Sequence, residues 1–153
     1  MRSAHTLYFI RHGETDWNAE LRYQGQTDIP LNAKGRAQSR RNGEALKAHV
    51  ESFSELDFVS SPLRRTRDTM EIMRDSLALD PKEYRVDHRL IEISYGIWEG
   101  HLLSDLNKID ADGLKAREKD PFYARPDGGE SYADLLVRTL DWLQTVTRDT
   151  VVV

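Results

Sequence analysis

The 153-residue chain contains no cysteine. It therefore has no thiols for a disulfide framework, a cysteine nucleophile or a cysteine-ligated metal site. No stretch is long and apolar enough to span a bilayer, and the first residues lack the apolar segment of a secretory leader. These absences predict a cytoplasmic protein that does not have a membrane as its partner.

The sequence also lacks an excess of positive charge. Its 22 lysines and arginines against 26 aspartates and glutamates give a net charge of -4 at pH 7. This balance argues against nucleic acid as a partner, although a few cations that converge in one pocket can still bind phosphate. None of the five histidines stands at a metal-site spacing such as His-Glu-x-x-His, so we predict a reaction that needs no metal.

Strand-like and helix-like segments alternate along the chain, which has no internal repeat and no low-complexity linker. This alternation predicts an α/β fold, in which a mainly parallel sheet is flanked by helices on both faces. The length suits a single domain over residues 1–153. We expect strands at 6–10, 56–59, 84–86 and 150–153, helices at 33–50, 61–77 and 131–146, a weaker helical stretch at 104–118 that breaks near 110–113, and long loops at 14–31 and 89–100.

Three of the helix starts carry capping residues. Asn32 precedes the first predicted helix and can accept a hydrogen bond from its free amide groups. Ser61, with Pro62 at the first helical position, predicts the start of the second helix. Ser131, followed three residues later by Asp134, resembles a capping box at the start of the last helix.

The first strand ends abruptly in Arg11-His12-Gly13. Ligands of open α/β sheets bind beyond the carboxyl ends of the strands, so this sequence delivers a cation and a nucleophile to that crevice. Gly13 allows the backbone to turn sharply and another group to approach it closely. Taken alone, the tripeptide is also compatible with an ordinary histidine at a strand end.

Five motifs, in order, resemble those of the histidine phosphatase superfamily, the phosphoglycerate mutase-like proteins. The resemblance spans nearly the whole chain and implies a phosphoglycerate mutase-like three-layer sandwich. The motifs are Arg11-His12-Gly13-Glu14-Thr15-Asp16-Trp17-Asn18, Gln24-Gly25, Ser61-Pro62-Leu63-Arg64-Arg65-Thr66, Glu92 with Tyr95-Gly96-Ile97-Trp98-Glu99-Gly100, and Gly128-Gly129-Glu130-Ser131.

The resemblance implies that His12 is phosphorylated during turnover. A neutral imidazole nitrogen can attack phosphorus and divide one displacement into two easier ones. Guanidinium groups match phosphate oxygens with paired hydrogen bonds, which suits Arg11 beside the nucleophile. The family pattern places the second clamp at Arg65, whereas Arg64 fits a solvated position.

The leaving alcohol needs a proton, which a nearby carboxylic acid can supply before it later activates water. By resemblance the general acid is Glu92, which lies just before the Tyr95-Gly96 pair. Glu99 is the rival, although its Trp-Glu-Gly turn is typical of a structural position. Glu14 fits a bracing role at the end of the first strand.

Further roles follow from the resemblance alone. It implies substrate contacts at Asn18, Gln24 and Gly25, and we add Tyr95 to this group. Bracing and helix capping are expected from the Gly-Gly-Glu-Ser motif, whose last two residues are Glu130 and Ser131.

The family has a second catalytic histidine, in a His-Gly pair directly after the last predicted strand. The sequence ends at Val153, where that pair is expected. A free terminal carboxylate there would repel phosphate. We therefore expect a C-terminally truncated chain, in which the last part of the fold is missing.

The resemblance implies a phosphomonoesterase that acts on a small phosphorylated metabolite through a phosphohistidine and needs no cofactor. The alternative is a cofactor-dependent phosphoglycerate mutase, for which 2,3-bisphosphoglycerate would be the phosphoryl donor. The short interval between Glu92 and the Gly-Gly-Glu-Ser motif favours the phosphatase. A non-catalytic phosphate-binding protein is a third hypothesis, and a homodimer is left open.

Overall fold

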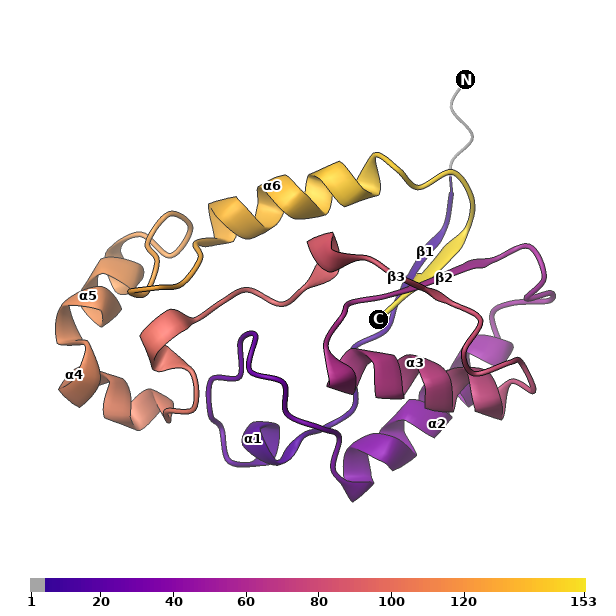
Figure 1. The fold of residues 1–153 in the computed structure, drawn as a ribbon, viewed down its shortest axis with the longest axis horizontal. Helices are drawn as coiled ribbons and strands as arrows, with labels where there is room; N and C mark the ends of the chain where they lie inside the picture. Colours follow the sequence, from indigo (N-terminus) through magenta and orange to yellow (C-terminus); the bar gives the residue numbers. More distant parts are fainter. Residues whose placement is uncertain (1–4) are drawn as a thin grey trace.

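The computed structural model describes residues 5–153 and confirms the α/β fold (Figure 1). Its sheet has four parallel strands in the order β1-β4-β2-β3. All carboxyl ends therefore lie at one edge, where a ligand crevice is expected. The strands are β1 (Leu7–Phe9), β2 (Asp57–Ser60), β3 (Arg85–Val86) and β4 (Thr150–Val152).

Helices α2 and α3 connect strands that are consecutive in the sequence, whereas α4 and α5 belong to the long connection between β3 and β4 and lie away from the sheet (Figure 1). Helices α2 and α3 pack on each other below the sheet, and α6 runs on its other side (Figure 1). Short 3-10 turns lie between β3 and α4. The helices are α1 (Asp16–Ala19), α2 (Ala33–Lys47), α3 (Arg64–Ser76), α4 (Leu106–Ile109), α5 (Ala111–Lys119) and α6 (Tyr132–Leu143).

The core lies between the sheet and the pair α2–α3. Phe58 and Val151 are paired across β2 and β4, and both are buried against Met70 and Met73 of α3. Both methionines lie on the inner face of this helix and are fully buried. This packing fixes α3 against β2 and thereby sets where the first turn of α3 meets the carboxyl edge.

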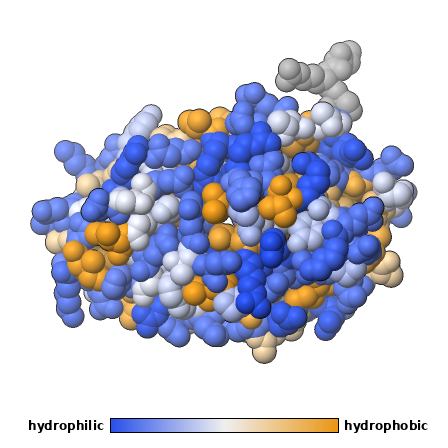
Figure 2. All heavy atoms as spheres, viewed as in Figure 1, coloured by the Kyte–Doolittle hydropathy of each residue, from blue (hydrophilic) through white to orange (hydrophobic). Residues whose placement is uncertain are grey.

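The opposite face of the sheet is covered less completely in the described part of the chain. Phe9 of β1 is 68% exposed, and Leu136, Leu140 and Leu143 of α6 are also exposed. Figure 2 shows one face of the molecule, on which hydrophobic residues form several small groups among hydrophilic ones. Across residues 5–153, none of the helices combines the length and the apolar character that crossing a bilayer requires.

The capping predictions at Asn32 and Ser131 are confirmed, whereas the one at Ser61 is wrong. Asn32 caps α2 by accepting from the Gly35 amide, and Ser131 forms a capping box with Asp134. Helix α3 begins only at Arg64, because the Ser61 amide donates to the Val153 carbonyl at 2.9 Å and so keeps the chain extended.

Other element boundaries differ modestly from the predictions. α2 ends at Lys47 instead of residue 50, and α6 ends at Leu143 instead of residue 146. The loop predicted at 14–31 contains the four-residue helix α1, which Thr15 and Asn18 cap reciprocally. The break predicted at 110–113 is confirmed, because Asp110 ends α4 and caps α5.

Candidate active site

Two neighbouring cavities open at the carboxyl edge of the sheet, and Arg11 and His12 line both. The inner cavity, of about 240 Å³, is also lined by Ser61, Arg65 and Glu92. The outer cavity, of about 340 Å³, is lined by Arg11 and His12 together with Glu14, Asn18, Gln38 and Asn42. The structure thus brings the four predicted catalytic side chains, from three separate segments, to one cavity.

His12 is held in a single orientation. Its Nδ1 lies 2.7 Å from the Gly13 carbonyl oxygen, which can only accept a hydrogen bond. The proton is therefore on Nδ1, and Nε2 keeps its lone pair. Burial lowers the pKa of His12 below its ordinary value, and the charges of Arg65 and Arg11 lower it further. These effects outweigh the Gly13 hydrogen bond and Glu92, so the ring is neutral at pH 7.

The turn that follows His12 is locked by two helices. The Gly13 amide donates to Thr69 Oγ1 of α3 at 3.0 Å, and Thr69 also accepts from Ser39 of α2. A Cβ at Gly13 would lie 2.2 Å from the Gly35 carbonyl oxygen at the start of α2. Glycine is required here by this close approach, which confirms the prediction from the sequence.

Replacing Thr69 by valine is expected to lower the free energy of unfolding by about 1–3 kcal/mol, because the buried Gly13 amide loses its acceptor. Urea denaturation measures the change. The matched control is Thr139→Val in α6, where the hydroxyl donates only to the Leu135 carbonyl of the preceding turn. An equal loss in both variants would show that Thr69 does not hold this turn.

Arg65 is 1% exposed, and its guanidinium is only partly satisfied. Nη1 and Nη2 donate to the carbonyl oxygens of Thr27 and Gly25, at 3.0 and 2.7 Å. Within residues 5–153, Arg65 Nε and Ser61 Oγ are buried and have no hydrogen-bond partner. Unsatisfied buried polar atoms are rare, and these two belong to residues that line the same cavity as His12.

Glu99 fixes the loop to which Arg65 is bound. Its carboxylate accepts hydrogen bonds from the amides of Gln26 and Thr27 at 3.0 Å each and from the Thr27 hydroxyl at 2.5 Å. It also accepts from the Tyr95 amide at 3.0 Å. With its oxygens engaged in this way, Glu99 acts as a structural acceptor, and the geometry favours Glu92 over this rival as the general acid.

Glu92 presents a freer carboxylate to the inner cavity. Its side chain is exposed and accepts only from the adjacent Ile93 amide, at 2.8 Å, among the contacts of the described residues. Its backbone is clamped instead, because its carbonyl oxygen accepts from Gln26 Nε2 at 3.0 Å and from Arg138 Nη2 at 3.1 Å. The carboxyl group is therefore open to solvent on a backbone that two side chains hold in place.

Arg138 and Gln26 are residues that the sequence analysis missed. Arg138 of α6 also donates to the Arg89 carbonyl at 2.7 Å and is paired with Glu130, whose carboxylate accepts from the Ser94 amide. The expected bracing role of Glu130 is thus present. Arg138 belongs to none of the five motifs, and only the packing of α6 against the 89–94 loop shows its role.

The other predicted side chains are placed as follows. Glu14 accepts from Lys34 and Asn32, which lower its pKa, and it braces the turn as expected. Asn18 lines the outer cavity. Gln24, Gly25 and Tyr95 line neither cavity, and their role as substrate contacts stays a prediction.

Gln24, Tyr95 and Gly25 each contact a different residue. Gln24 is buried and accepts from the Thr15 hydroxyl at 2.7 Å. The Tyr95 ring stacks edge-on against Tyr23, and burial raises its pKa. Gly25 has a φ of +52°, and a Cβ there would lie 2.1 Å from the Glu99 carboxylate.

Stability is expected to depend on pH through His12. The unfolded chain protonates this histidine near pH 6.5, whereas the folded chain resists protonation until a lower pH. The free energy of unfolding should therefore fall as the pH decreases through this window, and it should stop falling below the folded pKa. Denaturation at pH 7.5 and at pH 5.5 measures this change. Between these pH values the free energy of unfolding should fall by more in the unsubstituted chain than in His12→Asn, and equal decreases would contradict the lowered pKa.

Residues 5–153 contain no group of three or more histidine, cysteine or acidic side chains placed to hold a metal ion. The positive charge of the site comes from Arg11 and Arg65. The expectation of a metal-independent reaction stays a prediction.

Comparison with known proteins agrees with this geometry. The family model of the histidine phosphatase superfamily (branch 1) matches residues 7–151. The chain is 36% identical over 129 residues to the probable phosphoglycerate mutase GpmB of Salmonella choleraesuis (strain SC-B67), an alignment that covers 84% of this chain. The chain spans only 57% of the length of that relative, and the expected truncation stays a prediction.

Solved structures with a similar fold indicate the same family. Bacillus stearothermophilus YhfR superposes with a TM-score of 0.80 at 32% identity, over 97% of this chain and 73% of that one. For mycobacterial hydrolase 1 the TM-score is 0.78 at 31% identity, covering 96% and 73% of the two chains. Phosphoglycerate mutase from Thermus thermophilus gives 0.72 at 35% identity, with coverages of 95% and 75%. The chain belongs to the histidine phosphatase superfamily.

Proposed function

We propose that the protein is a phosphomonoesterase that acts on a small phosphorylated metabolite through a phosphohistidine. The observation that carries this proposal is the unsatisfied pair Arg65 Nε and Ser61 Oγ, buried at the cavity that His12 and Glu92 also line. Phosphoryl oxygens of a bound substrate would supply the acceptors that these two groups lack. The neutral His12 ring, with its lone pair on Nε2, is the nucleophile that such a bound group needs.

In the first step, His12 Nε2 attacks phosphorus and forms a P–N bond while the ester P–O bond breaks. The Glu92 carboxylic acid gives its proton to the departing alkoxide, so that a neutral alcohol leaves. Arg65 and Arg11 balance the negative charge on the transferring oxygens. The Nδ1–H bond to the Gly13 carbonyl becomes stronger as the ring gains positive charge.

In the second step, water attacks the phosphohistidine. The Glu92 carboxylate takes a proton from this water, the P–N bond breaks and orthophosphate leaves with the new oxygen. The step restores the His12 lone pair and the protonated Glu92. It uses no metal or other cofactor, because the guanidinium groups supply the charge that phosphoryl transfer requires.

A phosphoglycerate mutase is the second candidate, and the curated relatives carry the name probable phosphoglycerate mutase. A solved relative is called a hydrolase. The two activities share the first step and differ in whether water or a second hydroxyl group accepts the phosphoryl group. For a mutase, 2,3-bisphosphoglycerate would be the donor that charges His12.

The test incubates the purified chain with 3-phosphoglycerate and with a panel of sugar phosphates, and measures released orthophosphate and 2-phosphoglycerate separately. Orthophosphate release is the expected result, and isomerisation without release would establish the mutase. Labelled substrate should also leave acid-labile phosphate on the protein. Tight binding of orthophosphate with neither product nor labelled histidine would support a non-catalytic phosphate-binding protein instead.

A further inference from the structure

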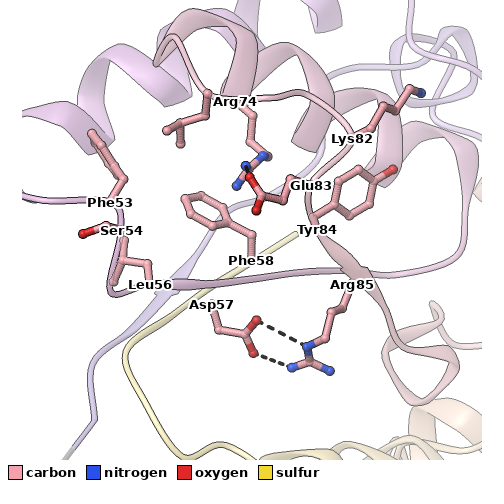
Figure 3. A pocket seen from close by; sticks show the side chains of 11 residues that line it. Phe53, Ser54, Leu56, Asp57, Phe58, Arg74, Lys82, Glu83, Tyr84 and Arg85 are labelled. Atoms are coloured by element: carbon pink, nitrogen blue, oxygen red, sulfur yellow. Dashed lines mark hydrogen bonds and ion pairs between the residues drawn. The ribbon is translucent and has the colours of Figure 1, made fainter.

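A larger cavity, of about 680 Å³, lies at the amino-terminal edge of the sheet, away from the candidate active site (Figure 3). It begins at Asp57, the first residue of β2, and reaches Arg74 in the last turn of α3. Arg65 of the active site lies nine residues earlier on α3, which corresponds to about 13 Å along the helix axis. The two sites therefore lie toward opposite ends of the same helix. We call this space the Arg74 cavity.

Five aromatic or aliphatic side chains and six polar or charged ones line the Arg74 cavity. The rings of Phe53, Phe58 and Tyr84 face the cavity (Figure 3), and Leu56 and Leu79 also line it. The volume of this cavity falls in the range of sites for small organic molecules. Its three aromatic rings suit a flat ring system.

One of the polar side chains of this lining, Arg74, is a buried cation. The Arg74 side chain is 4% exposed, and its guanidinium lies over the Phe58 ring, with Cζ 4.3 Å from the centroid. Nε donates to the Asp80 carbonyl at 2.7 Å, which fixes the orientation of the group. Nη2 lies 3.6 Å from a Glu83 carboxylate oxygen, so the face toward the cavity already holds a carboxylate of the protein itself.

Glu83 is a weakly held partner. Its side chain is 82% exposed, and 3.6 Å is longer than a normal hydrogen bond. The other charged side chains at the rim already have partners, because Lys82 is paired with Glu71, and Arg85 is paired with Asp57 (Figure 3). A carboxylate that enters the cavity therefore competes with the Glu83 carboxylate for Nη2 of Arg74, and the charge of Asp80 also acts on this guanidinium.

We propose that the Arg74 cavity binds a small aromatic carboxylate. The ring of this ligand packs between Phe58 and Tyr84, and its carboxylate takes the place of the Glu83 carboxylate on the Arg74 guanidinium. Planar guanidinium groups bind carboxylates through two parallel hydrogen bonds, which Glu83 does not achieve at its present distance. The proposal does not depend on the activity proposed for His12.

The test titrates the purified chain with 2-naphthoate and follows the heat of binding and the tryptophan and naphthoate fluorescence. An excess of inorganic phosphate occupies the site at Arg65 and keeps 2-naphthoate from binding there. Glu83→Gln should tighten binding by up to about fivefold, the upper range for one exposed ion pair. Arg74→Lys keeps the charge but loses the planar fork, and it should weaken binding by at least about tenfold.

Two controls make the outcome decisive. Glu20→Gln removes one negative charge from another exposed ion pair, that with Arg22, and should leave the affinity unchanged. The neutral 2-naphthalenemethanol should bind more weakly than the carboxylate and should not respond to Glu83→Gln. Equal binding of the two compounds, or equal effects of the two glutamate substitutions, would overturn the proposal.

Discussion

Replacing His12 by asparagine is expected to lower the turnover of a phosphomonoester by about 10⁴-fold or more, the range for losing a nucleophile. Asparagine keeps a side-chain N–H that can donate to the Gly13 carbonyl, as His12 Nδ1 does. The lone pair of its amide nitrogen is delocalised into the carbonyl group and cannot attack phosphorus. The substitution therefore separates the chemical role of the ring from its place in the turn, and orthophosphate release measures the difference.

The control is His49→Asn, which changes an exposed histidine beyond the carboxyl end of α2 and should leave turnover unchanged. A second measurement follows the phosphate label that the substrate leaves on the protein. Acid-labile phosphate should be present in the His49 variant and absent from the His12 variant. More than about one hundredth of the original turnover in His12→Asn would point to another nucleophile, because no water-activated path reaches that rate without one.

The part of this site that could be predicted from sequence is the part determined by local rules. A run of apolar residues followed by Arg11-His12-Gly13 places a nucleophile at a strand end, since parallel strands expose their carboxyl ends to ligands. Capping residues located the first turns of α2 and α6 for the same reason, because the bonds they make span only three residues.

The start of α3 shows where local rules fail. Ser61 and Pro62 have the residue types of a helix start, but the Ser61 amide belongs to the sheet ladder through Val153, 92 residues away in the sequence. This partner delays the helix until Arg64 and leaves the Ser61 hydroxyl buried and free at the cavity. The error in the predicted boundary thus coincides with a candidate phosphate-binding group.

Arg138 was beyond prediction for a related reason, and for Glu99 the sequence predicted a structural turn but not the partners of its carboxylate. Their importance lies in hydrogen bonds to backbone groups of distant loops, which have no side-chain pattern of their own. Arg138 holds the carbonyl of Glu92, and Glu99 holds the loop whose carbonyls orient Arg65. Each of the two candidate catalytic groups is therefore positioned by a residue from another segment.

Replacing Glu92 by glutamine should lower the turnover of alkyl phosphates by about 10²- to 10⁴-fold, the contribution of a positioned general acid. The fold should be unaffected, because the Glu92 side chain is exposed and its carbonyl keeps the bonds from Gln26 and Arg138. With p-nitrophenyl phosphate the first step should be nearly normal, because p-nitrophenolate leaves without a proton. A burst of p-nitrophenol at millisecond times measures this step.

The matched substitution Glu99→Gln tests the rival acid by the same comparison. Glu99 accepts from the amides of Gln26 and Thr27, and an amide NH₂ in its place would face one of these donors. Loss of the Glu99 carboxylate should loosen the loop that orients Arg65. The turnover of alkyl phosphates and that of p-nitrophenyl phosphate should therefore fall by the same factor. When the leaving group needs no proton, only the proton donor becomes dispensable. A normal burst with p-nitrophenyl phosphate in Glu99→Gln but not in Glu92→Gln would therefore show that Glu99 is the general acid and that Glu92 has the structural role.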